Sequence, residues 1–220
     1  MIAVVIPAHN EAHDLRACLE AIQQSIQLLH RSHDREVRVL VVLDNCSDDS
    51  LKIVKDMGVE YIECNFSCVG KTRDLGVRHM IDLGATWISC TDADSSVEPQ
   101  WLLQQLKHQP TDAICGVVQI DNWHQLSAET QQQYLKHYQD SMDHRHIHGA
   151  NLSFSATAYL QAGGFKALSC HEDVNLVEQM QALNLKIVWS NLVRVTTSSR
   201  LDARAPEGFA HFLQQLETPP

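Results

Sequence analysis

The sequence predicts an α/β protein with a doubly wound, mostly parallel sheet and helices on both faces. Short apolar runs alternate along the chain with longer amphipathic ones, at the spacing that is typical of strand–helix–strand units. The run from Val37 to Leu43 is apolar apart from one arginine, which is typical of a parallel strand covered on both faces. In such sheets, ligands bind beyond the carboxyl ends of the strands.

The first half of the chain has the more regular pattern. Apolar residues recur every three or four positions between Leu15 and Leu29, which predicts an amphipathic helix. Ser47 or Asp48 suits an N-cap, and Pro99 suits the first turn of a helix. The predicted strands are 2–6 (ended by Pro7), 37–43, 59–64 and 86–91, and the predicted helices are 15–29, one after Asp48, one from the Gly70 region to about 83, and one from Pro99.

The second half is less regular, and it contains no linker or repeat. We therefore expect a single domain over residues 1–220, with halves at about 1–110 and about 111–220. Its predicted strands are 113–121, 148–154 and 185–189, and its predicted helices are 125–146, a short one ending at Gly163, one through Met180 and a last one from Pro206.

Composition excludes several classes of protein. The net charge is −10, which argues against nucleic acid as a partner and against adhesion to anionic membranes. The seven cysteines are an odd number and mostly lie in apolar runs, which favours reduced thiols in the cytoplasm. The apolar runs are too short for a transmembrane segment, and the amino terminus lacks the features of a signal peptide. We expect a cytoplasmic protein.

Two carboxylates follow the strand predicted at 86–91. Asp92 and Asp94 are separated by one residue, and alternate residues of an extended chain point the same way. Such a pair can hold Mg²⁺ or Mn²⁺, which often keeps its other positions for substrate phosphates. An isolated D-x-D more often consists of two solvated aspartates at a strand end than of a metal site. The metal interpretation gains weight because other polar residues follow two further strands, at 7–10 and 44–45.

Five short motifs occur in a fixed order near these strand ends. They are Val4-Val-Ile-Pro-Ala-His-Asn-Glu11, Val41-Val-Leu-Asp-Asn-Cys-Ser-Asp48, Gly70-Lys-Thr-Arg73, Thr91-Asp-Ala-Asp94 and His171-Glu-Asp173. From about residue 2 to about residue 180, the chain resembles the family-2 glycosyltransferases with the GT-A fold. The resemblance implies that the first half binds a nucleoside diphosphate sugar and a metal ion, and that the second half binds the acceptor.

The resemblance also implies roles for single residues. Asp44 would accept a hydrogen bond from the base, Lys71 and Arg73 would lie near base or phosphate, and Asp94 would be the direct metal ligand. Asp92 would reach the ribose or the metal. A helix start would also explain Asn10 and Glu11, because a polar residue followed by an acid suits the dipole at the amino end of a helix. The positions implied along the nucleotide-sugar are Pro7, Ala8, Asn10, Glu11, Asp44, Lys71, Arg73, Asp92 and Ala93, with Arg200 and Arg204 as candidates for the diphosphate or as plain surface arginines.

The acidic pair Glu172 and Asp173 is the candidate catalytic group. In inverting members of the family, the acid at the place of Asp173 takes the proton from the acceptor hydroxyl. Acids are also favoured at helix starts for electrostatic reasons. Some relatives retain configuration, so both stereochemical outcomes stay open. Two motifs depart from the family pattern, at 43–48 and 72–74, and this leaves the base preference of the donor (UDP- or GDP-type) open.

Several aromatic and imidazole groups lie in the second half. His144, His146 and His148 alternate, and we expect a solvated cluster on the acceptor side rather than a second metal site. Trp123, Tyr134 and Tyr138 suit either sugar stacking or ordinary packing.

The sequence thus predicts a metal-dependent glycosyltransferase that uses Mn²⁺ or Mg²⁺ and a small or lipid-like hydroxyl acceptor, with a homodimer as one possible assembly. Two alternatives remain. A sugar-phosphate nucleotidyltransferase would share the fold, but such enzymes carry a glycine-rich loop that Pro7-Ala-His-Asn10 lacks. A non-catalytic nucleotide-sugar-binding protein would need no base. A nicotinamide enzyme is disfavoured because the chain has no G-x-G-x-x-G motif.

Overall fold

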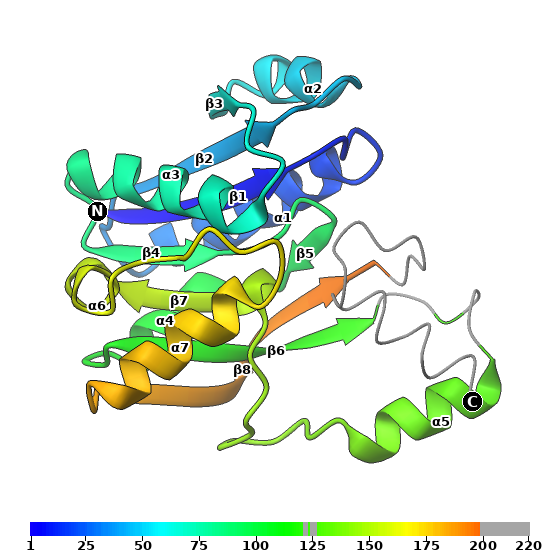
Figure 1. The fold of residues 1–220 in the computed structure, drawn as a ribbon, viewed down its shortest axis with the longest axis vertical. Coiled ribbons are helices and arrows are strands. Elements are labelled where there is room, and N and C mark those ends of the chain that lie inside the picture. The colour runs from blue at the N-terminus through cyan, green and yellow to red at the C-terminus, as the bar shows by residue number, and fades with distance from the viewer. Residues whose placement is uncertain (121–122, 124–126, 199–220) are drawn as a thin grey trace.

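The computed structural model describes residues 1–120, 123 and 127–198. Eight strands form one sheet in the order β3-β2-β1-β4-β7-β6-β8-β5 (Figure 1). Both halves of the chain contribute strands to it. Their bounds are Ile2–Ala8 (β1), Val37–Asp44 (β2), Glu60–Cys64 (β3), Trp87–Cys90 (β4), Ser95–Val97 (β5), Ala113–Ile120 (β6), Leu152–Ser155 (β7) and Ile187–Thr197 (β8).

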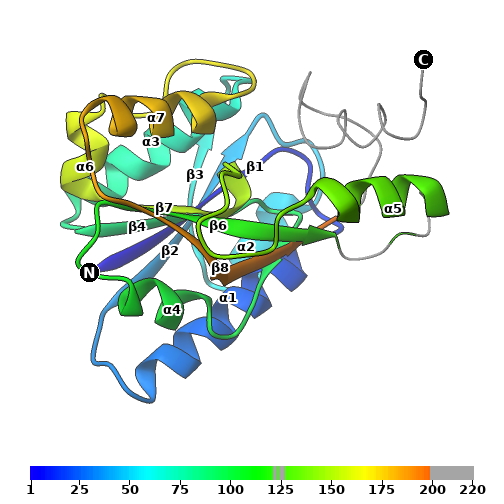
Figure 2. The same ribbon diagram turned by 90° about the horizontal axis from the view of Figure 1, so that it is seen from below.

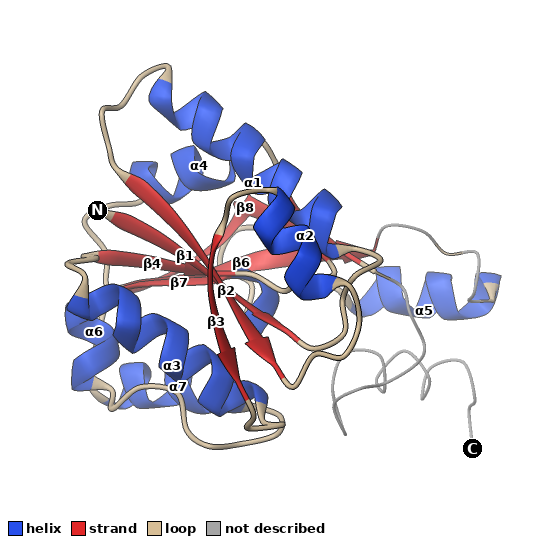
Figure 3. Ribbon diagram, turned by 90° about the horizontal axis from the view of Figure 1, so that it is seen from above, coloured by secondary structure: helices blue, strands red, loops and turns tan. Residues whose placement is uncertain are grey.

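Two layers of helices cover the sheet (Figure 3). Helices α1, α2 and α4 lie on one face, and α3, α6 and α7 lie on the other. Helix α5 extends away from the sheet, as Figures 1 and 2 show. The bounds are Leu15–His30 (α1), Ser50–Asp56 (α2), Val69–Asp82 (α3), Trp101–Lys107 (α4), Ala128–His137 (α5), Ala156–Gln161 (α6) and Glu172–Ala182 (α7), with a 3₁₀ turn at Gly149–Asn151.

The predicted, mostly parallel sheet is confirmed. Strand β1 pairs in parallel with both β2 and β4, β2 pairs in parallel with β3, and β6 pairs in parallel with β8. The short strands β7 and β5 run antiparallel to their neighbours. The carboxyl ends of β1, β2 and β4 therefore meet at one edge of the sheet, as expected for neighbouring parallel strands.

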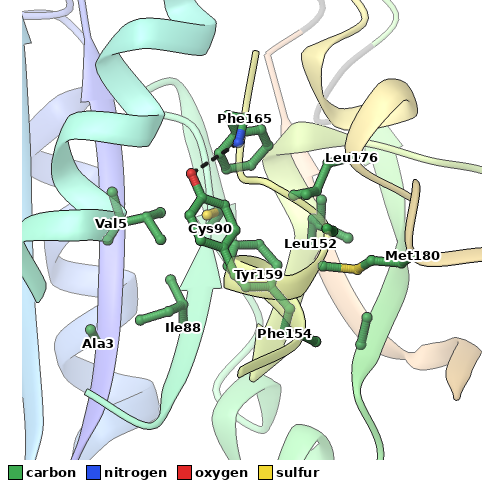
Figure 4. Packing of buried hydrophobic residues seen from close by; sticks show 14 of the residues in the cluster. Ala3, Val5, Ile88, Cys90, Leu152, Phe154, Tyr159, Phe165, Leu176 and Met180 are labelled. Atoms are coloured by element: carbon green, nitrogen blue, oxygen red, sulfur yellow. Dashed lines mark hydrogen bonds between the residues drawn. The ribbon is translucent and has the colours of Figure 1, made fainter. Parts of the chain in front are cut away.

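Each face of the sheet has its own hydrophobic core. Buried side chains of β1 alternate between the two, because successive residues of a strand point to opposite faces: Ala3 and Val5 face α3, while Val4 and Ile6 face α1. Figure 4 shows the core on the side of α3, in which the ring centroids of Phe154 and Tyr159 stack 5.0 Å apart. The Tyr159 hydroxyl accepts a hydrogen bond from the backbone N–H of Phe165 at 3.0 Å.

Several predicted elements have different bounds in the structure. The strand predicted at 148–154 begins only at Leu152, because Gly149–Asn151 form a 3₁₀ turn. Pro7 lies within β1 rather than ending it. Strand β4 pairs with β1 only as far as Val5, so at Pro7 the strand has a neighbour on one side only. A proline, which lacks the backbone N–H, is tolerated at such a position. The helix predicted at 125–146 ends at His137, because Tyr138 adopts an extended backbone conformation. The last strand extends to Thr197, past a register shift in its pairing with β6.

Strand β5 was not predicted, because its three residues are too few to show a period. Within the described residues, no helix combines the length and apolar character that crossing a bilayer requires. The helix predicted from Pro206 lies outside the described residues.

Candidate active site at the carboxyl edge

Asn10 ties the loop after β1 to the loop after β2. Its side-chain oxygen accepts hydrogen bonds from the backbone N–H groups of Ser47 at 2.7 Å and Asp48 at 3.3 Å. Asn10 has a φ of 55°, a left-handed conformation that asparagine adopts more readily than most residues. Next to it, the backbone N–H of buried Glu11 donates to the Ser50 hydroxyl at 3.0 Å. Asn10 and Glu11 therefore lock two loops together, directly after Pro7 and Ala8 of β1.

Asp44 organises the next loop along the edge. Its carboxylate accepts hydrogen bonds from the backbone N–H groups of Phe66, Ser67 and Cys68, and from the Thr72 hydroxyl at 2.7 Å. Burial alone would raise the pKa of Asp44, but the Thr72 hydroxyl and the three N–H groups together hold it below its usual value. The predicted base contact at Asp44 thus falls on a carboxylate that already has four donors from its own chain.

Asp92 and Asp94 follow β4, as the sequence predicts, and both are partly exposed while Ala93 between them is buried. The Ser95 hydroxyl donates to Asp94 at 3.3 Å. No three His, Cys, Asp or Glu side chains of residues 1–120, 123 and 127–198 gather as a metal site. Mg²⁺ commonly binds proteins through only one or two carboxylates and completes its shell with phosphates and water. The oxygen donors of Asp92 and Asp94 fit that mode.

Arg73 lies at the centre of the site and is buried. Its guanidinium donates to Glu172 at 3.0 Å, to the carbonyl of Gly149 at 3.0 Å, and to Asp92 at 2.5 Å. Burial alone would lower the pKa of Arg73, but Asp92 and Glu172 raise it above its usual value, so the group stays charged. The resemblance implies a place for Arg73 near base or phosphate, and the structure shows that three groups of its own chain hold the guanidinium.

Glu172 and Asp173 begin helix α7 but have different surroundings. Glu172 is buried, and burial raises its pKa although Arg73 opposes that shift. Asp173 accepts hydrogen bonds from the backbone N–H of Gly149 at 2.6 Å and from that of Val174 at 2.8 Å. His171, just before the helix, has a left-handed φ of 59°. Glu172 thus anchors Arg73, whereas Asp173 is fixed by a helix start and by one peptide group.

Lys71 is a predicted donor residue that is not brought to this centre. Lys71 is exposed, with its ammonium 5.9 Å from the ring of Phe66. It lines a surface groove of about 370 Å³ with Asp74 and Arg78 on α3. Arg200 and Arg204 lie outside the described residues.

The expectation of a solvated histidine cluster is wrong for His144, whereas His146 and His148 are half-buried. His144 is fully buried, and the ring of His146 stacks 4.1 Å from that of Tyr138. His148 Nε2 lies 3.2 Å from the Tyr138 hydroxyl, and burial, with His146 and His144 beside it, lowers the pKa of His148 to about 3. Tyr134 is also buried and stacks on Tyr138 at 5.0 Å. These rings form one packed column at the start of the 3₁₀ turn.

Sequence reasoning missed Gly149, which contacts both Arg73 and Asp173. The only signal was a glycine just after the histidines. Glycine has many uses, and none of them reveals which side chain from elsewhere in the chain will approach it.

Comparisons with known proteins identify the family and the fold. The model of the family "Glycosyl transferase family 2" matches residues 3–163. No curated protein matches the chain detectably in sequence. Among solved structures, TarS 1–349 of S. aureus in complex with UDP-GlcNAc superposes with a TM-score of 0.71 and 13% identity, over 98% of this chain and 64% of that one.

A second neighbour is the mannosyltransferase PcManGT of Pyrobaculum calidifontis in complex with GDP-Man and Mn²⁺. It superposes with a TM-score of 0.64 and 16% identity, over 98% of this chain and 60% of that one. The chain therefore spans less than two thirds of either structure. At such low sequence identity, these superpositions show a common fold and nothing further. The family match extends over most of the chain. The protein has the GT-A fold and belongs to glycosyl transferase family 2.

Proposed function

We propose that the protein transfers a sugar from a UDP- or GDP-type donor to an acceptor hydroxyl with inversion at the anomeric carbon. One observation carries this proposal: the contacts of Arg73 and Gly149 bring Asp92, which follows β4, and Asp173, which begins α7, to one edge of the sheet. Donor-binding and proton-accepting groups must lie close together for a direct displacement.

In the proposed reaction, Asp173 takes the proton of the acceptor hydroxyl as its oxygen attacks the anomeric carbon. The new carbon–oxygen bond forms while the bond to the phosphate oxygen breaks, and the electron pair leaves with the nucleoside diphosphate. A positioned base contributes roughly 10²–10⁴-fold to such a step. The backbone N–H of Gly149 holds the carboxylate of Asp173 in place through a 2.6 Å hydrogen bond.

A divalent cation would neutralise charge on the leaving phosphates. Asp94 and Asp92 are the residues that would hold it, and Mn²⁺ or Mg²⁺ suits their oxygen ligands. The neighbour that carries GDP-Man together with Mn²⁺ supports this assignment. Residues up to about 110 would bind the donor. The rest would bind the acceptor, a small or lipid-like molecule with a free hydroxyl.

The test is a thermal-shift screen with UDP, GDP and their sugar derivatives, with and without Mn²⁺. A ligand at 100 times its Kd stabilises the folded state by about 2.7 kcal/mol, so the cognate nucleotide should raise the Tm by several degrees, and only with the cation. Asp94→Asn should abolish the Mn²⁺-dependent part of the shift.

Asp56→Asn is the matched control, because it removes the same charge from an exposed position at the end of α2. It should leave the shift unchanged. The proposal fails if no nucleotide changes the Tm of the wild type, or if both variants respond like the wild type. Release of pyrophosphate from a nucleoside triphosphate would instead identify a nucleotidyltransferase, and donor binding without transfer to any acceptor would identify a binding protein.

A further inference from the structure

Gly149 is held from both sides of its backbone. Its carbonyl accepts a hydrogen bond from Arg73 Nη1 at 3.0 Å, and its N–H donates to Asp173 Oδ2 at 2.6 Å. The same guanidinium reaches Asp92 through Nη2 and Glu172 through Nε. A continuous set of contacts therefore joins a carboxylate after β4 to a carboxylate at the start of α7.

Only glycine fits at position 149. A Cβ there would lie 2.6 Å from Arg73 Nη2 and 3.0 Å from its Cζ, closer than real Cβ atoms approach other heavy atoms. The guanidinium cannot simply swing aside, because it is buried and three groups of the chain hold it. Any side chain at this position would shift Arg73, its bonds to both acids, or the peptide that holds Asp173.

We propose that Arg73 and Gly149 are positioning residues that couple the donor side of the site to the catalytic base. The inference rests on the proposed function and deepens it. A change at Asp92 when the donor binds is transmitted through one rigid guanidinium and one residue of backbone to Asp173. The base is then correctly placed only while Asp92 and Glu172 hold Arg73, so proton transfer depends on the contacts that the donor side makes with Arg73.

The first experiment compares Gly149→Ala with Gly58→Ala. Gly58 has open space where a Cβ would lie, although its φ of +64° strains any other residue. It therefore controls for the backbone cost of losing a glycine. The readout is nucleoside diphosphate release from UDP-GlcNAc and from GDP-mannose with Mn²⁺, with far-UV circular dichroism to verify folding. A misplacement of about 1 Å can cost about 10²-fold in rate.

We expect Gly149→Ala to lower kcat about 100-fold and Gly58→Ala to stay within about threefold of the wild type. Equal rates for the two folded variants would overturn the inference. If the wild type neither binds nor turns over either donor, the proposed function fails and this inference fails with it.

The second experiment is a cycle of Arg73→Lys and Asp173→Asn, which does not depend on Gly149→Ala folding. Lysine keeps the charge but cannot make three directed contacts. Residues that act as a unit give non-additive effects, so Arg73→Lys should lower kcat at least tenfold in the wild type and less than twofold beside Asp173→Asn. The same fold-change in both backgrounds would show that Arg73 acts independently of the base and would overturn the inference, while leaving the proposed function intact.

Discussion

The two sides of the carboxyl edge are built by different means. On the side of β1 and β2, hydrogen bonds from backbone N–H groups to the side-chain oxygens of Asn10 and Asp44 fix the loops. On the side of the 3₁₀ turn, stacked rings of Tyr138, His146 and His148 pack against one another. Hydrogen bonds to the backbone fix direction as well as distance, whereas stacked rings gain most of their stability from the apolar area that they bury.

This difference suggests how the site divides its work under the proposed function. A nucleotide presents the same chemistry to every relative that uses it, so a rigid set of loops suits it. Acceptors differ from one glycosyltransferase to another, and ring faces suit many of them. The column is also tied to the sheet, because the backbone N–H of Val118 in β6 donates to the Tyr138 hydroxyl at 2.7 Å. Arg73 and Gly149 lie where the side of the hydrogen-bonded loops meets the side of the stacked rings.

The largest effect should come from Asp173→Asn, which changes only the acceptor side. We expect turnover to fall about 10²–10⁴-fold, because the base is lost, while the nucleotide-dependent rise in Tm persists. Steady-state kinetics and a thermal-shift titration with the cognate nucleotide and Mn²⁺ measure both. Loss of nucleotide binding together with turnover would show that the two sides are not separable in this way.

Arg73→Met should damage both sides at once. Removing one partner from a buried ion pair costs about 3–5 kcal/mol, because the remaining charge stays buried, and Glu172 is the buried partner here. Urea unfolding measures the loss. The double variant Arg73→Met/Glu172→Gln should recover part of it, and no recovery would mean that the pair is not the cause.

Asp44→Ala should loosen the donor side alone. Three backbone N–H groups and the Thr72 hydroxyl lose their acceptor. An unsatisfied buried group costs about 1–3 kcal/mol, and water can reach part of this loop, so we expect a total loss of about 2 kcal/mol in urea unfolding. Asp49→Ala is the control, since Asp49 is exposed and makes no side-chain cap bond to α2. Equal losses for the two variants would contradict the role given to Asp44.

The histidine column should make the stability of the protein depend on pH. The folded state holds the pKa of His148 at about 3, below the ordinary value of 6.5. Its contribution to stability is therefore complete above pH 6.5 and is lost as pH falls towards 3, because the unfolded chain takes up the proton first. His144 and His146 shift in the same direction.

Urea midpoints measured between pH 7.5 and pH 4 should fall for the wild type and fall less steeply for His148→Gln. The lowered pKa of Asp44 affects stability only below its ordinary value of 3.8, outside this range. If the urea midpoints of the two proteins fell equally with pH, protonation of His148 would not lower the stability of the folded state.

Features that depend on residues close together in the chain could be predicted from the sequence, and contacts between distant residues could not. The alternation of strands and helices and the D-x-D at Asp92 and Asp94 were readable, because periodicity and strand ends are local features. The partners of Arg73 were not: Glu172 and Gly149 lie 99 and 76 residues further along the chain. The histidines were misread for a similar reason, since their burial depends on Tyr138 and Trp189 from other elements.

The sequence by itself therefore determined the class of fold, the family and the edge of the sheet that carries the polar residues. These follow from residue periods and from short motifs whose members are neighbours in the chain. The tertiary structure alone decided which charge pairs with which, and that Glu172 anchors an arginine while Asp173 is held by a peptide. The physical reason is that burial and ion pairing are set by groups close in space, and chain distance does not constrain which groups those are.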